Sequence, residues 1–139
     1  MKIDNFLEKI AHVSIHSDKD DINDFGPFYS IRKFPISFNL QVIIAFLNIV
    51  PETEYLLKID VVEDGDELQI DFSDKQLFIV PESSILFLNN GYGQSYSSTT
   101  IKLDIQSKGA YKIQFALARA DKPDNTLSTF FNYYYFGEI

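Results

Sequence analysis

Apolar and polar side chains alternate along most of this chain, which is typical of strands that bury one face. The clearest run spans residues 111–117, where large apolar residues alternate with polar or small ones. Residues 100–106 and 127–136 are also rich in β-forming residues, so three consecutive strands are expected to close the chain. The apolar positions of the clearest run are Tyr111, Ile113, Phe115 and Leu117.

Earlier parts of the chain show the same period. A long strand is expected at 36–47, with one apolar face that we predict to pack against residues 111–117 from the opposite sheet. Asp64-Gly65 predicts a tight hairpin, and Ser73-Asp74 a second turn. Residues 81–98 are expected to hold one short strand within a long loop. The apolar face of the long strand includes Phe38, Leu40, Val42 and Ile44, and the further strands are expected at 28–34, 55–62, 68–72, 76–80 and 85–88.

The first residues show a different spacing. Ile3, Phe6, Leu7 and Ile10 recur at helical intervals after a cap at Asp4, whereas residues 11–16 alternate. We therefore expect a short N-terminal helix followed by a strand, and then a polar loop over residues 17–27.

Eight or nine strands with little helix predict one all-β domain over residues 1–139, a sandwich of two antiparallel sheets. Within it, Ser107-x-Gly109-x-Tyr111-x-Ile113 resembles the tyrosine corner of immunoglobulin-like domains. The resemblance implies an immunoglobulin-like β-sandwich in which the Tyr111 hydroxyl bonds to backbone upstream. Ile113 stands where antibody domains have a cysteine, and the chain has no tryptophan for the position on strand C.

Two alternatives to that fold stay open. A jelly roll has similar strand spacing, and a plain hairpin would place Ile105 opposite Tyr111 instead of forming a corner. As a whole, the chain is also similar to small bacterial β-sandwich proteins with no assigned function, a resemblance that implies no site residues.

Charge and composition restrict the partners. Twelve basic and 20 acidic residues give a net charge of −8, so neither nucleic acid nor an anionic membrane is an expected partner. Zero cysteines exclude disulfides and thiolate metal sites. The charged start does not fit a signal peptide, and the longest apolar stretch, residues 42–47, is far shorter than the roughly 20 residues of a membrane helix. We expect a cytoplasmic protein without a cofactor.

Metal sites have two candidates. Asp18, Asp20, Asp21 and Asp24 could offer oxygen ligands to calcium, but their spacing does not match an EF-hand, and a solvated loop is the simpler interpretation. His12 and His16 would be separated by roughly 13 Å on a strand, which is too far for one metal ion.

Catalytic motifs are absent from the sequence. There is no Gly-x-Ser-x-Gly elbow, no dinucleotide fingerprint and no phosphate loop. Carboxylate pairs of a hydrolase are possible among 20 acidic residues, so a hydrolase is the third-ranked function, after two non-enzymatic ones.

Two aromatic features favour those binding functions. Asn90, Tyr92 and Tyr96 have the composition of a ligand loop and could bind a glycan, although a crossover whose tyrosines cover one end of the sandwich is the favoured interpretation. The last strand is aromatic on both faces, and a sandwich normally buries only one. We predict that Phe130, Tyr134 and Phe136 form an interface for a protein partner or a homodimer. The leading function is protein–protein binding, with carbohydrate binding as the alternative.

Overall fold

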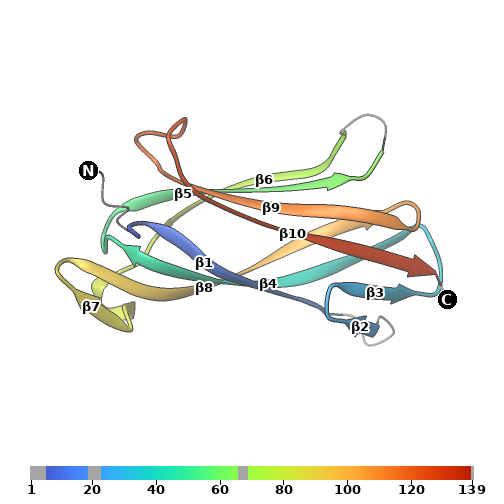
Figure 1. Cartoon of the computed structure of the whole chain (residues 1–139), viewed down its shortest axis with the longest axis horizontal. Coiled ribbons are helices and arrows are strands. Elements are labelled where there is room, and N and C mark those ends of the chain that lie inside the picture. The colour runs from blue at the N-terminus through green and yellow to red at the C-terminus, as the bar shows by residue number, and fades with distance from the viewer. Residues whose placement is uncertain (1–5, 19–22, 66–68, 139) are drawn as a thin grey trace.

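The computed structural model of the chain describes residues 6–18, 23–65 and 69–138, which form two sheets packed face to face (Figure 1). The four-stranded sheet has the order β1 (Lys9–Ser17), β4 (Ile36–Ile49), β8 (Tyr92–Ile105) and β7 (Phe87–Asn89). The six-stranded sheet has the order β2 (Asn23–Phe25), β3 (Phe28–Ile31), β10 (Thr126–Glu138), β9 (Gly109–Arg119), β5 (Glu54–Glu63) and β6 (Gln69–Ile79). A single 3₁₀ turn, η1 (Glu82–Ser84), precedes β7 among the described residues.

This strand order confirms the predicted immunoglobulin-like sandwich. The order β1-β4-β8-β7 corresponds to strands A, B, E and D of that fold, and β10-β9-β5-β6 corresponds to G, F, C and C′. Paired strands are antiparallel apart from β3, which runs parallel to the end of β10. The order decides against the jelly-roll alternative.

The tyrosine corner is confirmed as well. The Tyr111 hydroxyl donates a hydrogen bond to the carbonyl of Ser107, at 3.3 Å. Residues 106–108 cross from β8 in one sheet to β9 in the other, so the plain hairpin with Ile105 opposite Tyr111 is wrong.

The core lies between the two sheets, as the alternation predicted. The inward side chains of β9 and β4 belong to one buried cluster, to which β1, β5, β8 and β10 also contribute. Its members from β9 and β4 include Tyr111, Ile113, Phe115, Leu117, Phe38, Leu40, Val42 and Ile44.

The prediction of an N-terminal helix is wrong over residues 6–10, the part of it that the structure describes. β1 begins at Lys9, and residues 6–8 are not helical, while Ile3 lies outside the described residues. A bulge between Ile10 and His12 lengthens the spacing of the inward residues, so that Val13 follows Ile10 at an interval of three. The helix was predicted from Ile3, Phe6, Leu7 and Ile10, and of these Ile10 lies in β1, where it pairs with Phe46.

Three further boundaries differ from the prediction. The loop expected at residues 17–27 contains β2, and the turn expected at Ser73 is absent because β6 continues through it. The Ser73 hydroxyl instead donates to the Asp60 carboxylate across the strand pair, at 2.8 Å. The loop expected up to residue 98 ends early, because Asn90 and Gly91 form a tight turn from β7 into β8.

Candidate functional site

Four exposed aromatic side chains lie on the outer face of the six-stranded sheet, and we call them the aromatic stripe. Three come from β10 and the fourth from the neighbouring β3. Their exposed fractions range from 44% to 67%, which is unusual for rings of this size. The stripe consists of Phe28 at 58%, Phe131 at 46%, Tyr133 at 67% and Tyr135 at 44%.

Strand register places these rings side by side. Tyr135 lies directly opposite Phe28, and Tyr133 lies opposite Lys112 of β9. The rings of Phe131 and Tyr133 meet edge to face with their centroids 5.7 Å apart. The Lys112 ammonium lies 5.1 Å from the centre of the Phe131 ring, a cation–π contact that joins β9 to the stripe.

The predicted interface of Phe130, Tyr134 and Phe136 faces the opposite way and is wrong. Tyr134 and Phe136 are buried in the core, and Phe130 packs against it. Phe136 stacks on Tyr29, with ring centroids 5.3 Å apart. A bulge between Thr126 and Ser128 changes which residues of β10 face inward, and the sequence alternation did not show it. Burial in this environment raises the pKa of Tyr134.

A hollow of about 320 Å³ lies beside Tyr133, where β5, β9 and β10 meet at one end of the six-stranded sheet. The hollow is lined by residues of mixed character, which are Val62, Glu63, Asp64, Ala110, Tyr111, Lys112 and Tyr133. Sequence reasoning did not find it, because β9 and β5 are separated by almost fifty residues and become neighbours only in this sheet order.

A second group of polar side chains, centred on Glu8, connects separate segments of the sandwich by hydrogen bonds. The Glu8 carboxylate accepts hydrogen bonds from the Tyr55 hydroxyl and from Arg119 Nε, each at 2.8 Å. The Tyr55 oxygen also accepts the Val50 N–H at 2.8 Å. Burial is the main cause that raises the pKa of Tyr55, and the bond to Glu8 raises the pKa of Arg119.

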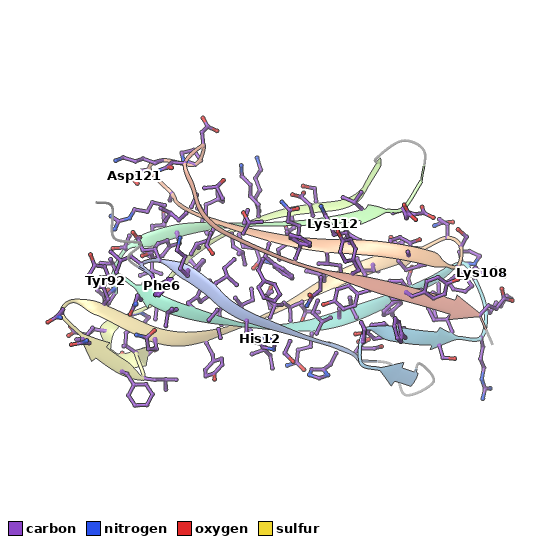
Figure 2. The ribbon with its side chains drawn as sticks, in the orientation of Figure 1. Phe6, His12, Tyr92, Lys108, Lys112 and Asp121 are labelled. Carbon is purple, nitrogen blue, oxygen red and sulfur yellow. The ribbon has the colours of Figure 1, made fainter. Side chains whose placement is uncertain are left out.

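The predicted glycan residues do not form a loop. Asn90 occupies the turn, whereas Tyr92 and Tyr96 lie on β8, on the outer face of the four-stranded sheet. They are four positions apart on a strand, which corresponds to roughly 13 Å. Tyr96 is 65% exposed, and Figure 2 shows Tyr92 at the opposite end of the view from Lys108. Their role in binding a ligand stays a prediction.

The predicted metal residues lie largely outside the description. Asp20, Asp21 and the side chain of Asp24 lie outside the described part of the structure. Asp18 accepts hydrogen bonds from the backbone and side-chain amides of Asn39. Across residues 6–18, 23–65 and 69–138 no three His, Cys, Asp or Glu side chains cluster as metal ligands. The same part of the chain forms no helix that could span a membrane.

No protein-family model matches the sequence, and no curated protein matches it either. Solved structures with the same fold do exist. A bacterial adhesin from Mobiluncus mulieris superposes with a TM-score of 0.64 at 7% identity, over 94% of this chain and 58% of that one. A second crystal form of that adhesin gives 0.56 at 9% identity, over 82% and 44%.

A chain from Bacteroides fragilis that is provisionally assigned as a β-galactosidase gives a TM-score of 0.59 at 15% identity, over 91% of this chain and 17% of that one. This chain therefore spans less than two thirds of each of these structures. At such identities the likeness shows the fold, which is the sandwich that the strand order already defines.

Proposed function

We propose that this chain is a non-enzymatic binding module that acts through protein–protein contact, with the aromatic stripe as its docking surface. The observation that carries the proposal is the exposure of four neighbouring rings on one sheet face. Aromatic residues are enriched at protein interfaces because they bury a large area at a small cost in side-chain entropy. One protein with a similar fold, solved in two crystal forms, is described as an adhesin, which is in keeping with a binding role.

Charged side chains lie beside the aromatic stripe on the docking face. Lys58 and Lys75 lie directly opposite each other on β5 and β6, on the same face as Lys112. Among the described residues the one ion pair joins Arg119 to Glu8, so these lysines have no carboxylate within salt-bridge distance there. Asp60 also lies on the outward side of β5, where it accepts a hydrogen bond from Ser73, so this face carries charges of both signs.

Site-specific photo-crosslinking tests the docking surface. A photoreactive phenylalanine analogue replaces Phe131 in one variant and Tyr96 in the other, and both variants are irradiated in cells of the native host. Tyr96 is the control, because it is an exposed ring on the other sheet and is more exposed than Phe131, at 65% against 46%. We expect discrete protein adducts from position 131 and none from position 96. Equal adducts from both positions, or none from position 131, would contradict the proposal.

A further inference from the structure

A groove of about 570 Å³ lies between β1 and β10, which belong to different sheets. Residues 12–16 of β1 form one wall and residues 132–134 of β10 form the other, while Gly26 and Pro27 also line the groove. Figure 1 shows the two strands running in the same general direction. Five residues of a strand span roughly 16 Å, so the groove has the length of a short extended peptide.

The edge of β10 that faces the groove is only partly covered. β3 pairs with this edge from Tyr135 to Glu138, and no other described strand pairs with it before Tyr135. The Tyr135 N–H donates a hydrogen bond to the Pro27 carbonyl at 3.1 Å, so the backbone groups of Tyr135 point away from β9. Because these groups alternate in direction along a strand, the N–H and C=O groups of Phe131 and Tyr133 point to the same side. β10 therefore presents backbone donors and acceptors to which no described strand is paired.

β1 is an edge strand that also turns its backbone toward the groove. The Tyr29 hydroxyl donates to the Ile15 carbonyl at 3.3 Å, which shows that the backbone groups of Ile15 point away from β4. Val13 lies two positions earlier, so its backbone groups have the same direction. The side chains of Val13 and Ile15 are buried and line the groove. The groove thus combines an apolar floor with a strand edge along each wall.

Asn132 shows that the two sheets do not close over each other along this side. It lies opposite Ile113 in the register, so its side chain is on the inward face of β10. Ile113 is completely buried, whereas Asn132 is exposed. Inward positions of a sandwich are normally covered by the opposite sheet. That cover is missing beside Asn132, where the groove opens.

An extended peptide matches this groove. A strand presents N–H and C=O groups at the spacing of Phe131 and Tyr133, and addition of a strand to a sheet edge is a common mode of peptide recognition. β3 already occupies the next part of the same edge, so an added strand would extend the line of β3 along β10. A second copy of this chain is disfavoured as the donor, because each copy has a net charge of −8.

The lining defines which side chains such a segment can carry. Among the described residues, no Asp, Glu, Lys or Arg lines the groove. A charged side chain that points inward would therefore be buried without an opposite charge, which is costly. Successive side chains of a strand point to opposite faces, so every second one would lie inward near Val13 and Ile15. The others would lie outward, beside the rings of Phe131 and Tyr133.

We propose that the groove binds an extended segment of a partner protein, which adds as a strand to the edge of β10 in line with β3. The segment is about five residues long and has uncharged side chains at every second position. This inference rests on the protein contact proposed for the aromatic stripe, because the outward side chains of the segment lie beside Phe131 and Tyr133. It adds the conformation of the partner and the backbone hydrogen bonds that hold it.

Crosslinking from both sides of the groove tests the inference. The photoreactive phenylalanine analogue replaces His12 on β1 in one variant and Phe131 on β10 in another, and both full-length variants are irradiated in cells of the native host. His12 is suitable because it is an exposed ring that lines the groove. Mass spectrometry then identifies the residues of the partner that are joined to each position. We expect adducts from both positions, within one segment of about five residues in the same partner.

Three other outcomes would decide against it. Adducts from position 131 without any from position 12 would overturn the inference and leave the docking surface supported. Adducts from the two positions that map to distant segments of the partner, or to a second copy of this chain, would also overturn it. The absence of adducts from position 131 would contradict the docking surface itself, and the inference with it.

Two substitutions of Tyr133 separate backbone pairing from side-chain contact. Tyr133→Pro removes the N–H that faces the groove and leaves the ladder to β9 intact, since proline is tolerated where the N–H of an edge strand faces outward. Tyr133→Ala is the matched control, because it removes the same ring and keeps the N–H. With the crosslinker at position 12, we expect an adduct yield about fivefold lower in Tyr133→Pro than in Tyr133→Ala.

Amide NMR spectra verify that both variants keep the native fold. Equal adduct yields from two natively folded variants would overturn the inference. If Tyr133→Pro does not fold, the partner residues joined to positions 12 and 131 still decide the question, because those two variants keep Tyr133.

Discussion

Glu8 connects three segments that are distant in the sequence. Its N–H donates to the Asn48 carbonyl at 2.8 Å, and its carboxylate binds Tyr55 and Arg119. Glu8 and Asn48 both have positive φ angles, of 55° and 54°, which non-glycine residues rarely adopt. The bonds around Glu8 therefore hold the start of β1 in an otherwise unfavourable backbone conformation.

Removing the Tyr55 hydroxyl should destabilise the fold. Tyr55→Phe leaves the Val50 N–H without its acceptor and takes one donor from Glu8, so we expect the free energy of unfolding to fall by about 1–3 kcal/mol. Urea denaturation measures this fall in the free energy of unfolding. Tyr96→Phe, which removes an exposed hydroxyl, should change stability by no more than about 0.5 kcal/mol. An equal effect of both substitutions would show that the network contributes nothing.

The raised pKa of Tyr55 predicts a loss of stability in alkali. A tyrosine in the unfolded chain loses its proton near pH 10, while buried Tyr55 keeps it, so unfolding releases a proton above that pH. The stabilisation is complete below about pH 10 and decreases as the pH rises further. We expect urea midpoints to fall above pH 10, and to fall less steeply in Tyr55→Phe. If the urea midpoint fell with pH at the same slope in the unmodified protein and in Tyr55→Phe, the result would contradict the assignment of this pH dependence to Tyr55. Tyr134, whose pKa is also raised, accounts for part of the remaining slope.

The hairpin between β7 and β8 depends on two residues with positive φ. Asn90 and Gly91 have φ angles of 54° and 83°, as a two-residue turn between twisted strands requires. Gly91→Ala should weaken the hairpin by about 1–2 kcal/mol, because a Cβ atom is unfavourable in this conformation. Hydrogen exchange at the Leu86 amide, which bonds to the Gln94 carbonyl, should become faster. Asn90→Gly is the control, and it should leave this exchange nearly unchanged.

The strand β9 carries the centre of the core. Phe115 is almost completely buried, so Phe115→Ala should reduce the free energy of unfolding by about 3–5 kcal/mol through lost packing and the cavity that remains. Gln114→Ala, on the outward face of the same strand, is the matched control and should have a small effect. A loss below about 1 kcal/mol for Phe115→Ala would mean that the site collapses without a cavity.

The alternation of apolar residues predicted β4, β5, β9 and their inward faces, because period two follows directly from strand geometry. It was misleading at β10, where a single bulge changes the period and is not visible in residue types. The Asn90-Gly91 turn had a recognisable signal, since Asn-Gly between apolar runs is a strong hairpin marker. The parallel pairing of β3 with β10 had none, so Phe28 could not be placed beside Tyr135 from sequence alone.

The molecule carries a net charge of −8, yet the face with the aromatic stripe also holds three lysines. The overall charge predicts that the protein alone is a monomer, because each copy is acidic and like net charges repel each other. Light scattering at high protein concentration measures the oligomeric state directly. A stable dimer that dissociates when Phe131 and Tyr133 are both replaced by serine would instead identify a second copy as the partner.

β1 begins near one end of the long axis of the sandwich, and β10 ends near the other (Figure 1). Tension applied along this axis would pull β1 lengthwise against β4, and β10 lengthwise against β9 and β3. In that geometry the ladder hydrogen bonds share the load and must rupture together, whereas strands peeled from one end lose their bonds one at a time. The strand order thus favours slow unfolding under mechanical force, a property governed by the rate of unfolding and separate from the equilibrium stability.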